Sequence, residues 1–468
     1  MHYHTVMPES LTSRRQLWKE TWALAWPMAG ANLLLRGGAI VDTAMVGRLG
    51  AAELAGIGIA QIPVFLSLAV ERGLGVGGQV LVAYHTGAGE IERRLKVARA
   101  VVALSSIVAL AVAGLLWLAS PALCRMMGAD DAMLAQAMKY LHVYLLIFLF
   151  SGWFSTFTAI FQGVGDSKTP LYVTGMVNVL HVGISYVLIF GRLSLPQMGV
   201  AGAAVAIGIS ELIGAITLGA VAVRRGYWAP GLRGLSWGAT RAVWRLGSPT
   251  VAERLLVNGM QGFYTRLLTG FGTAAFAAHR IGVDMESVSF LPALGFAQAA
   301  TTTVGQRLGA KDPEGARRAG WVTTQMSCIF MGILGLSFYF FAEQWMRLFT
   351  PDPEVIKYGV KFCTVAALIQ IPLAFAMVVS GALRGAGETR WVMMMPLVGG
   401  WLFRLPLGYL LGYVWGFGLM GVWWMMLVDW SVRGALLSLK FRYMRFRLAD
   451  KVQAPIRVTS PEEGREIE

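Results

Sequence analysis

Charged residues are scarce in this chain. Only 14% of its 468 residues are Asp, Glu, Lys or Arg, whereas soluble domains average about 25%. Apolar residues make up 56% of the sequence, and the mean hydropathy is +0.58. This composition excludes an ordinary soluble enzyme or binding domain, and it predicts a polytopic membrane protein whose helices are surrounded largely by lipid.

Cysteine and histidine are also rare. The three cysteines, Cys124, Cys328 and Cys363, lie far apart without CxxC spacing, so we expect them to be packing residues and not a metal site or a disulfide. Only six histidines occur, and no predicted span contains an HExxH or GxSxG motif. An intramembrane enzyme would need such a metal cluster or a nucleophile–base set. We therefore expect neither enzymatic activity nor a cofactor.

Acidic residues are fewer than basic ones, at 26 against 40, which gives a formal net charge of +14. The basic residues cluster in short segments between apolar runs, so we expect no nucleic-acid partner. They recur in every second loop, and positively charged loops mark the cytoplasmic side of the inner membrane. This alternation predicts an even number of spans and places both termini in the cytoplasm.

Long apolar runs predict an all-α fold. At about 20 residues per span plus short loops, the length allows roughly twelve transmembrane helices. Ten-residue segments of alternating polarity do not recur, which disfavours a β-barrel. The predicted spans lie near residues 22–47, 54–82, 97–119, 134–162, 170–190, 200–223, 248–270, 274–303, 319–342, 358–383, 391–415 and 418–439.

The chain repeats itself at a nearly constant offset. Pro27 and Pro249 are 222 positions apart, and residues 161–166 (FQGVGD) align with residues 383–388 (LRGAGE) at the same offset. The repeat predicts two six-helix bundles of equal orientation, related by a pseudo-twofold axis along the membrane normal. The predicted domains are an N-terminal bundle (1–223), a basic cytoplasmic linker (224–247), a C-terminal bundle (248–440) and a polar cytoplasmic tail (441–468).

One carboxylate, Asp42, lies in the first apolar run. An acid at the centre of a membrane helix costs about 2.5–3.5 kcal/mol on insertion scales, so such residues commonly have a function. Arg36 lies about 240° away around the same helix, which makes it a poor partner within that helix. We therefore expect Asp42 to bind a coupling ion, although an ion pair with an arginine from elsewhere is the structural alternative.

Several motifs resemble the multidrug and toxic compound extrusion (MATE) family. They are residues 42–50 (DTAMVGRLG), residues 162–170 (QGVGDSKTP) and residues 384–390 (RGAGETR). The resemblance extends over about residues 20 to 440. It implies twelve helices in two bundles, and export of amphipathic, often cationic, compounds in exchange for protons or sodium ions. The DinF-like branch is the nearer one, because its coupling site lies in the first half.

The resemblance implies that the acid of the first span, Asp42 here, binds the coupling ion. Many members also carry an aspartate in the fifth span, in an Asn-x-x-Leu-Asp pattern. This chain keeps Asn178 but has Ser185 at the position of the acid, with His181 nearby. We predict cation coupling at Asp42 and Asn178. Protons are favoured over sodium, because a single buried carboxylate suffices for a proton.

Other acids fall within the predicted spans. Arg280 and Asp284, like Asp429 and Arg433, are four residues apart, so each pair can be structural. Glu286 has no such neighbour, and we predict that it is a second coupling site. The residues that need a partner from another span are Glu71, Glu253 and Arg404.

Aromatic residues are candidates for binding a cationic, drug-like substrate. Packing against helices or lipid is the alternative for each of them. The predicted function is a monomeric secondary antiporter that alternates access between its bundles. A flippase for a lipid-linked saccharide on a related scaffold is the alternative. The predicted substrate-binding residues are Trp153, Phe154, Phe157, Phe161, Tyr264 and Phe290.

Overall fold

The computed structural model describes residues 14–231, 234–446 and 448. Most of the predicted polar tail and two linker residues, 232 and 233, lie outside this part of the chain. The first half contains α1 (Arg14–Gly47), α2 (Ala51–Gly87), α3 (Ile91–Met126), α4 (Asp131–Val164), α5 (Lys168–Phe190) and α6 (Val200–Arg224). The second half contains α7 (Trp237–Thr269), α8 (Thr273–Gly309), α9 (Pro313–Phe340), α10 (Ala342–Arg347), α11 (Pro353–Gly385), α12 (Thr389–Met395), η1 (Pro396–Arg404), α13 (Leu405–Tyr409), η2 (Leu410–Val414) and α14 (Gly418–Tyr443).

The described structure is helical throughout, and eight of its helices are long and apolar enough to cross a membrane. They are α2 to α6, α9, α11 and the continuous helix over residues 389–414. The predicted all-α membrane fold is thus confirmed, although twelve spans were expected. Four further long helices, α1, α7, α8 and α14, fall outside this set because they carry more polar and charged residues.

Short polar side chains fix where several helices begin. Asp130, Ser236, Asp312 and Asp352 accept hydrogen bonds from backbone N–H groups in the first turns of α4, α7, α9 and α11. These N–H groups have no partner within the helix, so such caps stabilise its first turn. At the other end of α4, Gly165 adopts a φ of 95°, a conformation that favours glycine.

The helix bounds repeat along the chain. The bounds of α8, residues 273 and 309, each lie 222 positions after those of α2, residues 51 and 87. The halves differ where α9 ends early and α10 follows, and where the helix after α11 contains the π-helical segments η1 and η2. In a π-helix each hydrogen bond joins residues five apart in the sequence, where an α-helix joins residues four apart. The wider turn changes which side chains face the neighbouring helices.

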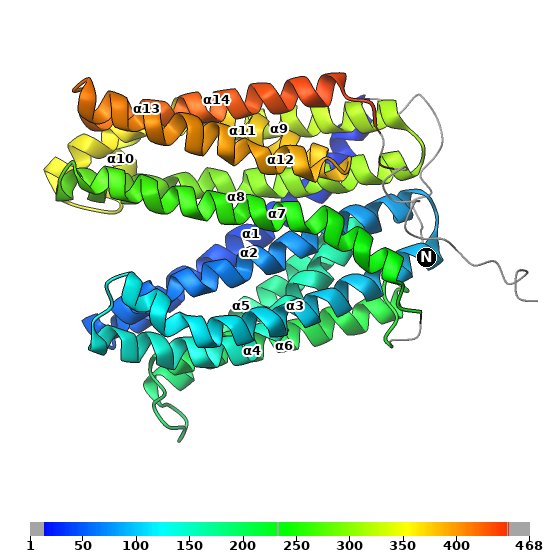
Figure 1. Ribbon diagram of the computed structural model, residues 1–468, viewed down its shortest axis with the longest axis horizontal. Coiled ribbons are helices and arrows are strands. Elements are labelled where there is room, and N and C mark those ends of the chain that lie inside the picture. The colour runs from blue at the N-terminus through cyan, green and yellow to red at the C-terminus, as the bar shows by residue number, and fades with distance from the viewer. Residues whose placement is uncertain (1–13, 232–233, 447, 449–468) are drawn as a thin grey trace, which may run out of the picture.

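Figure 1 shows two layers of helices, α2 to α6 in one and α8 to α14 in the other. We call the end that contains the turns at residues 88–90 and 310–312 the linker end, and the end with the turns at 48–50 and 270–272 the far end. Helix α1 crosses between the layers. At the linker end Arg14 donates a hydrogen bond to Gln325 of α9, whereas Asp42, near the far end, contacts α5.

The halves pack backbone to backbone toward the linker end. A Cβ atom at Gly77 of α2 would lie 2.6 Å from the carbonyl oxygen of Val243 in α7, and one at Gly87 would lie 1.8 Å from that of Gln306 in α8. Larger residues would force these helices apart. Small residues at such contacts are typical of helix packing in membranes.

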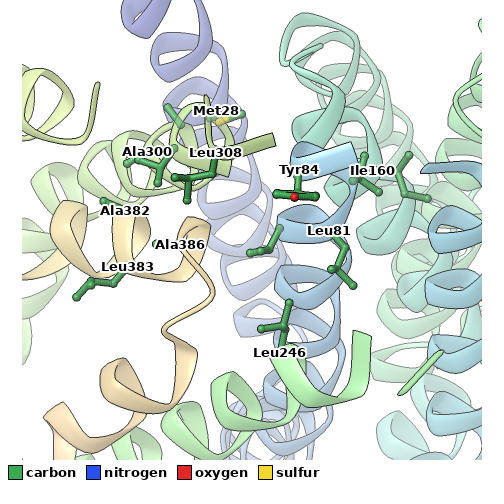
Figure 2. Close-up of a cluster of buried hydrophobic side chains, with 14 of the residues drawn as sticks. Met28, Leu81, Tyr84, Ile160, Leu246, Ala300, Leu308, Ala382, Leu383 and Ala386 are labelled. Carbon is green, nitrogen blue, oxygen red and sulfur yellow. The ribbon is translucent and has the colours of Figure 1, made fainter. Parts of the chain in front are cut away.

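A hydrophobic core closes the same region. Figure 2 shows Leu81 and Tyr84 of α2 converging with Leu246 of α7 and with Ala300 and Leu308 of α8. Each of these side chains is at most 9% exposed. The two halves are therefore held together at the linker end by burial of apolar surface.

The turn between α2 and α3 contains a polar cluster. Glu90 accepts hydrogen bonds from His85 at 2.7 Å and from Arg93 at 2.8 Å. Burial tends to raise the pKa of Glu90, but the hydrogen bonds and charges of His85 and Arg93 outweigh it, so the net pKa lies below its ordinary value of 4.5. The ionised form of Glu90 therefore stabilises this turn.

We expect Glu90→Gln to lower the melting temperature slightly at neutral pH. The loss corresponds to about 1 kcal/mol or less, because the carboxylate is partly exposed and the interaction is screened by water. A lowered folded-state pKa stabilises the protein above pH 4.5 and loses that contribution as the pH falls through the folded value. Melting curves of detergent-solubilised protein should thus converge in acid. A difference that persists at pH values where Glu90 is protonated would contradict this account.

Candidate functional site

Asp42 of α1 lies in a polar contact with α5. Its Oδ1 atom is 2.8 Å from Nε2 of His181, and the Ser185 hydroxyl donates to the same oxygen at 3.3 Å. The side chains of Asp42 and His181 are only 19% and 9% exposed. A carboxylate and an imidazole, both able to exchange protons, thus share a largely buried site between two helices.

Helical spacing explains how α5 forms its side of this site. His181 and Ser185 are four residues apart and so lie on one face of α5. Asn178 lies one turn nearer the linker end, where its Oδ1 atom faces Gly38 of α1 and its Nδ2 atom donates to the carbonyl oxygen of Thr174. Asn178 therefore flanks Asp42 without contacting it through any hydrogen bond in the described chain.

More acids surround this pair within the first half. The Ser151 hydroxyl of α4 donates to Glu211 of α6, and the charge of Glu211 acts on His181. Glu71 of α2 is buried and interacts electrostatically with Glu211. Two carboxylates, Asp42 and Glu211, therefore act on His181, and Glu71 lies near the second of them. This makes the interior attractive to a cation.

The second half contains a buried charge cluster of a different kind. Asp429 of α14 is fully buried. It lies 2.8 Å from Nε of Arg404, the last residue of η1, and it also pairs with Arg433. Trp430 stacks beneath both guanidinium groups, with ring distances of 5.7 and 5.0 Å. Asp429 is thus the partner from another helix that Arg404 was expected to need. The predicted contact between Asp429 and Arg433 is also present.

Glu286 of α8 lies apart from these ion pairs. It is 9% exposed, and no salt bridge reaches it among the described residues. The charge of Arg404 acts on it, and Tyr264 of α7 is another electrostatic neighbour. Its neighbour Asp284, by contrast, lies 2.8 Å from Arg36 of α1 and 3.6 Å from Arg280. Arg36 therefore joins the two halves and does not pair with Asp42.

Most of the aromatic candidates are packed inside the protein. Phe154, Phe157 and Phe161 are at most 6% exposed and belong to the core that closes the linker end. Trp153 donates through Nε1 to the hydroxyl of Ser106. These four side chains have structural neighbours that account for their positions.

The two aromatic candidates of the second half differ. Tyr264 is fully buried, and its hydroxyl donates to the carbonyl oxygen of Val422 at 3.3 Å. Phe290 of α8 is 37% exposed. Of the predicted substrate contacts, Phe290 therefore offers the most accessible ring.

The sequence did not identify the partner of Asp42. The sequence does place His181 and Ser185 on one face of a helix. It contains no local pattern that shows that this helix, α5, packs against α1. No role was predicted for Glu211, which the structure brings near His181. Across the described residues, no group of three or more His, Cys, Asp or Glu side chains is arranged to hold a metal ion.

The MatE family model matches residues 27–187 and 249–410. The "probable multidrug resistance protein NorM" of Thermotoga maritima is 31% identical over 428 residues, which covers 90% of this chain and 92% of that protein. A protein of the same description from Rhizobium meliloti is 29% identical and covers 92% and 93% of the two chains.

Several solved structures have a fold similar to that of this chain. A mutant of the Vibrio cholerae MATE transporter VcmN aligns with a TM-score of 0.87 at 23% identity, covering 92% of this chain and 98% of that one. The eukaryotic MATE transporter AtDTX14 aligns with a TM-score of 0.83 at 20% identity, covering 95% and 100%. At such identities the similarity establishes the fold.

Proposed function

The chain belongs to the MatE family, and from that premise we propose that it is an antiporter that exports amphipathic, often cationic, organic compounds in exchange for protons. The contact between Asp42 and His181, 2.8 Å long, carries the proposal. Binding of a proton at this pair would neutralise a buried charge. That change would alter the balance between two conformations of the first half, which is how an ion gradient can drive transport.

The chemistry of the ligands supports protons over sodium. Hard cations such as Na⁺ favour several oxygen ligands, whereas imidazole nitrogen suits softer transition metals. Here the nearest partner of the Asp42 carboxylate is the nitrogen of His181, and Ser185 supplies only one further oxygen. We propose Asn178 as a supporting polar group and Glu286 as a second, independent protonation site.

The arrangement of the halves supports alternating access. Their close contacts, such as those at Gly77 and Gly87, lie toward the linker end. We propose that the described state is closed at the linker end, that this end is cytoplasmic, and that Phe290 contacts substrate.

Finer assignments follow the same proposal. We place the protein in the DinF-like branch, because its candidate coupling site lies in the first half. We propose twelve spans, counting the charged helices α1, α7, α8 and α14, in two bundles (1–223 and 248–440) about a pseudo-twofold axis. The monomer would function in the inner membrane with both termini in the cytoplasm.

A flippase for a lipid-linked saccharide is the second candidate. It would need a cationic surface for the pyrophosphate group of its substrate. Two buried arginines of the second half, Arg404 and Arg433, are paired with Asp429, whereas Arg254 has no salt bridge among the described residues and its buried Nε atom has no acceptor. The flippase alternative predicts that a water-soluble dye would not be exported.

The test uses proteoliposomes that contain a fluorescent cationic dye. We expect an inward proton gradient to drive loss of the dye and an inward sodium gradient at equal pH to have no effect. A protonophore provides the control, because it should abolish the proton-driven loss without changing passive leakage. If sodium alone drives export, the proposed proton coupling is wrong. If neither gradient drives it, the antiporter assignment for this dye fails.

A further inference from the structure

Three arginines meet where the two halves begin to diverge. They are Arg72 of α2, Arg254 of α7 and Arg384 of α11, which we call the arginine group. Arg254 interacts electrostatically with both of the others. A Cβ atom at Gly73, next to Arg72, would lie 2.5 Å from a methyl carbon of Val251, so α2 and α7 are in contact at this level.

Two members of the arginine group lie far from the ends of their helices. At 1.5 Å per residue, Arg72 is about 22 Å along α2 from Gly87, and Arg254 is about 22 Å along α7 from Thr269. Neither residue is therefore near the end of its helix, whereas Arg384 lies in the last turn of α11. Arg72 is exposed and Arg254 is partly buried. An arginine in the middle of a membrane helix is costly in lipid and normally faces a partner or a polar cavity.

Only one of the three arginines has a carboxylate partner. Glu253 accepts two hydrogen bonds from Arg384, at 2.6 and 2.9 Å. Among the described residues, no hydrogen bond or salt bridge reaches Arg72 or Arg254, and the Nε atom of Arg254 is buried without an acceptor. Glu71, which precedes Arg72 in the sequence, interacts electrostatically with Arg72 and also contacts Ser155 of α4.

The charges of the two halves therefore differ in kind. In the first half, Asp42 and Glu211 act on His181, and the charge of Arg72 acts on Glu71 and Glu211. At the interface, Glu253 pairs with Arg384 and leaves Arg254 without a salt bridge among the described residues. Arginine forms strong paired hydrogen bonds with carboxylates and phosphates. An amphiphile that carries both a cationic and an anionic group could thus contact both regions.

We propose that the arginine group binds the anionic group, a carboxylate or a phosphate, of an amphiphile that enters between the halves. This inference rests on the proposed export function and extends its substrates to zwitterionic and anionic amphiphiles. The unpartnered guanidinium of Arg254 supplies the hydrogen bonds, and Arg72 adds positive charge from the opposite half. Glu253 orients Arg384 and limits the excess charge when the substrate is absent.

Binding measurements on the full-length protein in a nonionic detergent test this inference without requiring transport. Two rhodamine dyes are used that differ only in having a free carboxylate or its ethyl ester. We expect Arg254→Gln to weaken binding of the carboxylate dye about tenfold and to leave the ester dye unchanged. Arg254→Lys should retain only part of the affinity, because it keeps the charge but loses the paired hydrogen bonds of the guanidinium. Arg390→Gln removes an exposed arginine at the start of α12 and serves as the matched control.

The results separate the inference from the proposed function. Equal weakening for both dyes, or no change for either, would overturn the anion site even if the protein exports the ester dye. Competition then identifies the source of the anionic group. Displacement of the carboxylate dye by short-chain phosphatidylglycerol or phosphatidylcholine, but not by short-chain diacylglycerol, assigns the site to lipid phosphate groups. Displacement by none of these lipids assigns it to the carboxylate of a soluble amphiphile. Equal displacement by diacylglycerol, which has no anionic group, contradicts the proposal.

Discussion

Asp42→Asn should reduce proton-driven efflux to the rate of protein-free liposomes while leaving dye binding intact. Asparagine has nearly the same shape as aspartate and can still accept a hydrogen bond from His181 or Ser185. It cannot ionise, so the site loses the negative charge that a bound proton would neutralise. Efflux from proteoliposomes and dye binding in detergent are the two measurements.

The matched control for Asp42→Asn is Asp284→Asn. Asp284 also lies within a long helix, but it already pairs with Arg36 and Arg280. We expect the Asp284 variant to retain proton-driven efflux. If Asp42→Asn exports dye at the wild-type rate, Asp42 is structural and Glu286 becomes the candidate to test. If both variants lose efflux and binding together, general destabilisation is the cause.

Asp429→Asn should destabilise the second half by about 3–5 kcal/mol, because it leaves Arg404 and Arg433 buried without a counter-charge. Their side chains are only 5% and 7% exposed, so water cannot replace the lost carboxylate. We expect a large drop in melting temperature in detergent, or failure to purify as a single species.

An exposed ion pair with the same spacing controls for the effect of burial. Glu314 and Arg318 are also four residues apart, at 3.1 Å, but their side chains are 83% and 48% exposed. Glu314→Gln should leave the melting temperature nearly unchanged, since exposed pairs contribute little. Equal melting temperatures for the Asp429 and Glu314 variants would show that Asp429 is not needed for stability.

Local spacing made part of the candidate site predictable. The pairs Arg280–Asp284 and Asp429–Arg433 follow from helix geometry, which brings residues four apart onto one face. Asp42 was identified by a different argument, the free-energy cost of placing a carboxylate in an apolar membrane helix. The position of Phe157 and Phe161 was not predictable, because an aromatic residue in an apolar run can face a ligand, lipid or the core equally well.

The sequence alone determined that the chain is helical, that it enters a membrane and that its pattern repeats after 222 residues. These properties follow from the hydrophobicity and order of neighbouring residues. Only the tertiary structure decided which charges meet. His181 pairs with Asp42 from a distance of 139 positions, Arg36 reaches Asp284 in the other half, and Arg404 approaches Asp429 from a π-helical turn. Such contacts depend on how whole helices pack and cross, and no local pattern of residues encodes that arrangement.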